Sequence, residues 1–335
     1  MERIETATIE VSIVVPTYNR RCSLQQTLFA VAQQDYPVTR FEVIVVADGC
    51  NDGTVELLQR LQSTLPYRLR WIVQEQSGPA AARNAAIAAA DGAIIAFLDD
   101  DVVPVAGWLS THMAHHSTDD RAVVIGPLSP GGDSRPAWVR WEDDSLQQQY
   151  RAMLSGVFRP TPRQFYTGNS SARRAWILRA GGFDIRLRRA EDVELAFRLQ
   201  DLGLHFYFDP QAEGRHRSFR TYRSWQGIPR QYGHNDVVMG RDQGRVQLLF
   251  AAGQEFHRRR RGTRILARLC VGHPSLFNLT IGALGLVARS ANRFDKYPAS
   301  AAACSAIWNL AYWQGLCESL GGKTAFWQLV GSQAS

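Results

Sequence analysis

The chain has 335 residues, of which 45% are hydrophobic and 21% are charged, as in an ordinary folded protein with one large domain and an appendage or two modest domains. Five scattered cysteines without a CxxC pair argue against a disulfide framework and a structural zinc site. The net charge of +7 makes anionic partners plausible, although nearly all of it is arginine, a bias that a GC-rich genome explains by itself.

The amino-terminal segment bears on the cellular compartment of the protein. The first twenty residues begin with charged side chains and hold only a short apolar run, which is too short for a signal peptide. Together with the unpaired cysteines, this predicts a cytoplasmic catalytic part.

The first hundred residues alternate between strand and helix patterns. Short apolar runs predict strands at residues 11–16, 41–49, 69–75 and 93–100. Apolar spacing and capping residues predict helices at residues 23–34, 52–64 and 79–91. Unbroken apolar strands that alternate with helices indicate a parallel sheet covered on both faces, whose ligands bind beyond the carboxyl ends of the strands.

The pattern loosens between about residues 107 and 171, where a helix over 137–154 is flanked by turn-rich segments. A helix that ends at Gly203 and a following strand restore the regular pattern. After about Trp225 the chain is expected to be mostly helical.

Three consecutive acids, Asp99, Asp100 and Asp101, follow the fourth predicted strand. A solvated acidic loop is one interpretation. The position at the ligand-binding edge of a parallel sheet favours another, in which Asp99 and Asp101 hold Mg²⁺ or Mn²⁺ together with substrate phosphates. A divalent ion would relieve the repulsion among the three carboxylates.

Other candidate residues also have two interpretations each. Asp48, at the end of the second strand, either caps a turn or accepts a hydrogen bond from a base or ribose. Arg83, one turn into an alanine-rich helix, is either solvated or contacts a diphosphate. Glu191 and Asp192 open a helix, where they either serve its dipole or supply a general base. His216 is either a surface histidine or a third metal ligand.

Seven motifs occur in a recognisable order across some 215 residues: VSIVVPTYNR, VIVVADGCNDGT, SGPAAARNAAI, AFLDDDVVP, TGNSSARRAWILRAGGFD, RRAEDVELAFRL and RHRSF. Together they resemble family 2 glycosyltransferases. The resemblance implies an α/β GT-A fold, with a Rossmann-like, mostly parallel central sheet flanked by helices. It places a catalytic domain at residues 1–225 and a mainly helical carboxyl-terminal region at residues 226–335.

The resemblance also implies an inverting transferase that uses a nucleotide-diphosphate sugar and either Mn²⁺ or Mg²⁺. The donor and nucleotide would be bound by Pro16, Tyr18, Asp48, Arg83, Asp99 and Asp100. The sugar and acceptor pocket would be lined by Gly168, Asn169 and Glu191. Asp192 would be the general base, and the metal ligands would be Asp101, Asp99 and His216, with Asp101 the main one.

One motif departs from the family pattern. Where many members have DDGS after the second strand, this chain has ADGC, with Ala47 and Cys50, so that only the second acid, Asp48, is retained. This weakens any inference about which base is bound, although uracil is favoured. The expected acceptor is a glycan or a lipid-linked glycan in cell-surface glycan, polysaccharide or glycolipid synthesis, and a small metabolite remains open.

A basic run at residues 257–264 precedes two charge-poor stretches, residues 269–288 and 297–317. Interior proline, asparagine and glycine argue against membrane spanning and favour interfacial helices anchored by Trp308 and Trp313. The sequence thus predicts peripheral contact with an anionic membrane through residues 257–320, on the inner face of the plasma membrane. Packing into a soluble core or an oligomer is the alternative, and true spanning a third.

The sequence can be compared with three rival functions. A metal-dependent sugar nucleotidyltransferase is expected to have a glycine-rich basic loop after the first strand, which PTYNRRCS lacks. A non-catalytic sugar-nucleotide-binding protein is expected to lose Asp101 or Asp192, and both are present. No nucleic-acid partner is expected, because the basic residues are dispersed and no binding signature accompanies them.

Overall fold

The structure is a computed structural model that describes residues 8–132, 135–187, 189–217 and 220–332. The chain separates into two compact units. The first comprises Met1–Gly132 and Leu146–Ser218, and the second comprises Asp133–Ser145 and Phe219–Ser335. Each unit has its own core and is described by itself.

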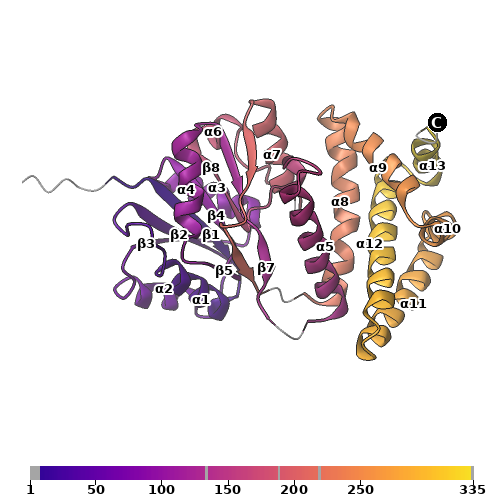
Figure 1. Cartoon of the computed structure of the whole chain (residues 1–335), viewed down its shortest axis with the longest axis horizontal. Helices are drawn as coiled ribbons and strands as arrows, with labels where there is room; N and C mark the ends of the chain where they lie inside the picture. Colours follow the sequence, from indigo (N-terminus) through magenta and orange to yellow (C-terminus); the bar gives the residue numbers. More distant parts are fainter. Residues whose placement is uncertain (1–7, 133–134, 188, 218–219, 333–335) are drawn as a thin grey trace, which may run out of the picture. The chain divides into compact units, whose positions relative to one another are not determined.

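The first unit is built on a seven-stranded, mostly parallel sheet (Figure 1). In spatial order its strands are β3 (Arg68–Gln74), β2 (Phe41–Asp48), β1 (Val11–Thr17), β4 (Ile94–Leu98), β8 (Asn169–Arg173), β6 (Ala122–Ile125) and β9 (His205–Phe208). Only β8 runs antiparallel to its neighbours. The four amino-terminal strands expected from the sequence are therefore confirmed, and they form one parallel block.

Helices accompany this sheet along the chain. They are α1 (Arg21–Val31), α2 (Thr54–Leu61), α3 (Pro79–Ala89), α4 (Trp108–Thr118), α6 (Arg174–Arg179) and α7 (Glu191–Asp201), with a 3-10 turn at Pro162–Gln164. A second, three-stranded sheet has the order β5 (Val102–Pro104), β10 (Gly214–His216) and β7 (Leu128–Pro130). Helix α5 (Ala137–Leu154) contributes residues to both units.

The central strand β1 shows why the sheet is covered on both faces. Ile13 and Val15 belong to a core that contains residues of α1 and α2. Val14, which points to the opposite face, belongs to a core with residues of α3 and α7. All three side chains are fully buried. A strand buried on both faces is expected to be nearly continuous in apolar residues. In β1 the exceptions are Thr17 and Ser12, and the buried Ser12 hydroxyl donates to Glu42 Oε1 at 2.7 Å.

The second unit is helical in its described part. It consists of the first residues of α5 and of α8 (Tyr222–Asp242), α9 (Val246–Arg258), α10 (Arg261–Cys270), α11 (Pro274–Arg293), α12 (Tyr297–Leu320) and α13 (Lys323–Gly331). Helix α12 runs alongside α8 and α11 (Figure 1).

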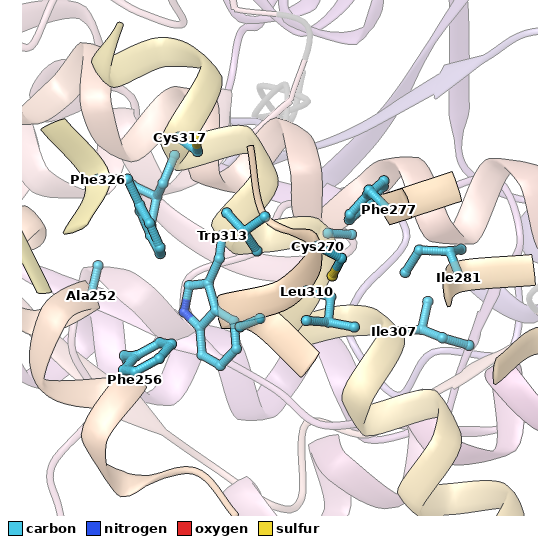
Figure 2. Close-up of a cluster of buried hydrophobic side chains, with 14 of the residues drawn as sticks. Ala252, Phe256, Cys270, Phe277, Ile281, Ile307, Leu310, Trp313, Cys317 and Phe326 are labelled. Carbon is cyan, nitrogen blue, oxygen red and sulfur yellow. The ribbon is translucent and has the colours of Figure 1, made fainter. Parts of the chain in front are cut away.

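Helix α12 forms the core of this unit. Its Ile307, Leu310 and Trp313 lie among buried side chains of the neighbouring helices, including Phe256 and Phe277 (Figure 2). The expectation of an interfacial helix over residues 297–317 anchored by Trp313 is therefore wrong, because Trp313 is only 1% exposed. The long apolar stretch serves the core instead. Within the described residues, no helix is long and apolar enough to cross a membrane.

Candidate active site

The three acids lie in the turn between β4 and β5, at the carboxyl end of the parallel strands. Arg20, which directly precedes α1, contacts two of them. Its Nη1 donates to Asp100 Oδ1 at 3.0 Å and to Asp101 Oδ2 at 2.7 Å. The hydroxyl of Thr17 donates to Asp100 Oδ2 at 2.7 Å. Burial raises the pKa of Asp100 to about 6, against the opposing effect of the Arg20 guanidinium.

Arg83 joins the remaining acid to the start of α7. Its Nη2 donates to Asp99 Oδ1 at 3.0 Å, and its Nη1 donates to Glu191 Oε1 at 2.9 Å. The Arg83 side chain is only 6% exposed, and its guanidinium lies 5.8 Å from the centre of the Phe183 ring. Arg83 is thus a buried bridge between two of the predicted site residues.

Asp192 lies at the amino terminus of α7, where the backbone turns sharply. Ala190 precedes the helix in the left-handed conformation, with φ at 56°, which is unusual for a residue with a side chain. The Val193 amide donates to Asp192 Oδ1 at 2.8 Å. Burial raises the pKa of Asp192 to about 7, and the charge of Glu191 adds to the shift. A carboxyl group with a pKa near 7 suits a general base at neutral pH.

The pairing of β5 with β10 brings two predicted metal ligands together. His216 pairs with Val102, and the Arg217 amide donates to the Asp101 carbonyl at 2.9 Å. His216 Nε2 consequently lies 3.4 Å from Asp101 Oδ1. Asp99 is held instead by Arg83. Across the described ranges, no three His, Cys, Asp or Glu side chains converge as a group able to hold a metal ion. The carboxylate and imidazole of Asp101 and His216 suit Mn²⁺ or Mg²⁺ as two ligands.

The predicted nucleotide-binding residues differ in accessibility. Tyr18 is 46% exposed beyond the end of β1, and Pro16 lies within that strand beside Val46. Asp48 is buried, and its carboxylate is engaged within the protein.

Three groups donate to Asp48 from the end of β3 and the segment that follows it. They are the Gln74 side chain at 2.8 Å, the Ser77 amide at 2.7 Å and the Gly78 amide at 2.9 Å. These donors belong to the end of β3 and the loop before α3, not to the ADGCNDG turn, so Asp48 joins the end of β2 to that loop.

Gly168 and Asn169 have different positions. A Cβ atom added to Gly168 would lie 3.0 Å from Asp99 Oδ2, so this glycine lets the backbone approach the acid closely. Asn169 is fully buried. Its Oδ1 accepts from Trp108 Nε1 at 2.6 Å and lies 3.1 Å from His112 Nε2, and its Nδ2 donates to two backbone carbonyls. The expected contact of the Asn169 side chain with sugar or acceptor does not fit this burial.

Two site features were missed from the sequence. Arg20 and Thr17 both lie in the PTYNR motif, whose arginine directly after a strand end is the signal that points to them. Cys50, the departure from the family motif, has its sulfur 3.4 Å from both the Thr17 carbonyl and the Asn19 amide. It therefore links the loop after β1 to the loop after β2.

The chain is similar to known glycosyltransferases. Residues 12–180 match the family model of glycosyl transferase family 2. Over 99 residues the chain is 41% identical to the glycosyltransferase AglE of Haloferax volcanii, a match that covers 30% of this chain and 33% of AglE. The chain spans about half or less of the length of the curated relatives it matches first.

Two solved structures share the fold. The mannosyltransferase PcManGT from Pyrobaculum calidifontis, solved with GDP-Man and Mn²⁺, has a TM-score of 0.61 at 21% identity and covers 91% of this chain and 87% of its own. Residues 1–349 of S. aureus TarS, solved with UDP, give 0.53 at 17% identity and cover 93% and 92%. The predicted GT-A fold with its helical carboxyl-terminal region is confirmed. With half of its residues matched by the family model, the chain belongs to glycosyl transferase family 2.

Proposed function

We propose that this protein is a glycosyltransferase that moves a hexosyl or hexosaminyl group from a nucleotide-diphosphate sugar to an acceptor hydroxyl, with inversion at the anomeric carbon. The observation that carries the proposal is the placement of Asp192. Its carboxyl group has a pKa near 7 at the start of α7, and Glu191 beside it is joined through Arg83 to Asp99. The neighbour of the proposed base is thus joined through Arg83 to the acids at the end of β4.

In the proposed reaction, Asp192 accepts the proton of the acceptor hydroxyl. The oxygen forms a bond to the anomeric carbon while the bond from that carbon to the diphosphate oxygen breaks. The bonding electrons leave with the nucleoside diphosphate. One displacement from the opposite face inverts the configuration.

Asp101 and His216 would hold a Mn²⁺ or Mg²⁺ ion, which would supply positive charge against the leaving diphosphate. The Mn²⁺ in the PcManGT structure supports a divalent ion here. Asp99 is proposed as a further ligand: its Oδ1 pairs with Arg83, just as Asp101 Oδ2 pairs with Arg20. Arg20 keeps Asp100 and Asp101 at this edge of the sheet.

The nucleotide is proposed to lie against Tyr18 and Pro16, with Asp48 shaping the adjacent loop. UDP is favoured, supported by the UDP complex of TarS, and GDP is the alternative that the PcManGT complex offers. A glycan or lipid-linked glycan is the proposed acceptor. The five cysteines are all free, in keeping with a cytoplasmic site of action.

The exchange Asp192→Asn tests the base. It is expected to lower the turnover of sugar transfer by at least about a hundredfold, since a positioned base contributes roughly 10²–10⁴-fold. The affinity for UDP, measured by calorimetry with Mn²⁺, is expected to change little. Asp201→Asn, at the exposed end of the same helix, serves as the matched control.

Near-normal turnover of the Asp192→Asn variant would contradict the assignment. Product analysis separates the rival activity, because a transferase releases a nucleoside diphosphate whereas a sugar nucleotidyltransferase releases pyrophosphate. A panel of UDP- and GDP-sugars in this assay also identifies the base.

A further inference from the structure

Helix α11 is apolar on two opposite faces. Its buried face packs into the core of the second unit through Phe277, Ile281, Gly285 and Ala288. On the other side four large apolar side chains are exposed: Leu276 by 42%, Leu279 by 69%, Leu286 by 61% and Val287 by 50%. At 100° per residue these four fall within an arc of roughly 100°. The outer face of a helix in a soluble core is normally polar, so this stripe needs a partner.

The neighbouring helix α10 also exposes apolar side chains. Ile265 and Leu269, one turn apart, are each 56% exposed. Arg261 and Arg268 are exposed on the same helix, while Ala267 and Cys270 are buried. Helices α10 and α11 contact one another within the second unit.

The segment that holds these apolar side chains carries charge of a single sign. Residues 256–294 contain eight arginines and no aspartate or glutamate. Seven of the arginines are exposed: Arg258, Arg259, Arg260, Arg261, Arg268, Arg289 and Arg293. Glu255 and the exposed Asp295 lie just outside this segment, and Glu255 pairs with Arg258 and Arg259.

We propose that the exposed apolar residues of α10 and α11, with their flanking arginines, dock on the surface of an anionic phospholipid bilayer. We call these residues the arginine–leucine face. Leucine side chains would enter the headgroup boundary, while the guanidinium groups contact lipid phosphates. Within the described residues no helix can span a bilayer, so the helices lie on it.

This face is narrower than residues 257–320, because α12 is buried in the core. It also fits lipid better than a second copy of the chain. A two-fold contact through this face would bring arginines against arginines with no acid from residues 256–294 to separate them. The proposal does not depend on the assignment of the donor site.

Co-sedimentation of the full chain with vesicles tests it. Vesicles of phosphatidylcholine alone are compared with vesicles that contain about 30% phosphatidylglycerol, at about 0.05 M and 0.5 M salt. Binding to the anionic vesicles at low salt is expected to exceed binding to the neutral ones by about tenfold or more, and to fall at high salt.

Two double variants separate the contributions. Leu279→Gln with Leu286→Gln removes the apolar part, and Arg261→Gln with Arg268→Gln removes charge. Each is expected to weaken binding to anionic vesicles by about tenfold. Leu154→Gln with Leu178→Gln, two exposed leucines of the first unit, is the matched control and is expected to bind as the parent chain does.

Equal binding to both vesicle types, no binding to either, or unchanged binding of both face variants would overturn the proposal. So would a parent chain that is dimeric in solution and a leucine variant that is monomeric, as measured by light scattering, because the face would then join two copies. Hydrolysis of a soluble donor sugar nucleotide is measured in parallel, so that a loss of catalysis is not mistaken for a loss of lipid binding.

Discussion

Residue by residue, the site is a set of acids held by arginines. Arg20 contacts Asp100 and Asp101, and Arg83 contacts Asp99 and Glu191. Asp192 stands next to this network and has no arginine within ion-pair distance among the described contacts. Burial and the charge of Glu191 raise its pKa to about 7, against the opposing charge of Arg83.

The pH dependence of transfer follows from this pKa. Asp192 must be ionised to accept a proton, so kcat/KM is expected to fall by up to about tenfold per unit below pH 7. Because the charge of Glu191 contributes to the raised pKa, Glu191→Gln is expected to move the acidic limb of the profile to lower pH. A profile that stays flat down to pH 5 in the parent enzyme would contradict the role of Asp192.

At the scale of elements, the site depends on which strands pair. The motif order places Asp48 and Asp99 at one sheet edge because β1, β2 and β4 are parallel, and this much is predictable from apolar runs alone. The approach of His216 to Asp101 depends on β10, a three-residue strand whose pairing no local pattern reveals. Which acids the two arginines pair with was likewise beyond prediction, since these pairs join residues up to 108 positions apart.

The turn-rich segment before β8 shows the same limit. The motif around Asn169 suggested that this residue contacts a ligand. Its side-chain oxygen instead contacts Trp108 and His112 of α4. The charge-poor stretch over residues 297–317 is compatible with a helix at a membrane interface and with a helix in a protein core. Its packing against α8 and α11 shows that it is a core helix.

The Asn169 side chain accordingly connects β8 to α4. Asn169→Ala is expected to lower the free energy of unfolding by about 2–4 kcal/mol, because the indole N–H of Trp108 and two carbonyls lose a buried partner. Urea unfolding measures the change, with the exposed Asn278→Ala as control. A loss below about 0.5 kcal/mol would show that water replaces the amide.

At the scale of the whole molecule, two units carry different chemistry. The first holds the proposed donor and base residues around a parallel sheet, and the second holds the arginine–leucine face around a helical core. The division into a catalytic domain at residues 1–225 and a helical region at residues 226–335 remains a proposal about function. Helix α5 has residues in both units, so no single boundary along the sequence separates the two units.

The pairing of Arg20 and Arg83 with the acids has a practical consequence for handling the protein. These guanidinium groups are built-in counter-ions, so two of the three negative charges at the end of β4 are offset within the chain itself. Chelators are therefore expected to leave the thermal midpoint within about 2 °C of its value in plain buffer, unlike a fold that needs its metal. Differential scanning fluorimetry with and without EDTA checks this, and a clear drop would show that the ion also holds the fold. If the midpoint is unchanged, the enzyme can be purified metal-free and titrated with one cation at a time.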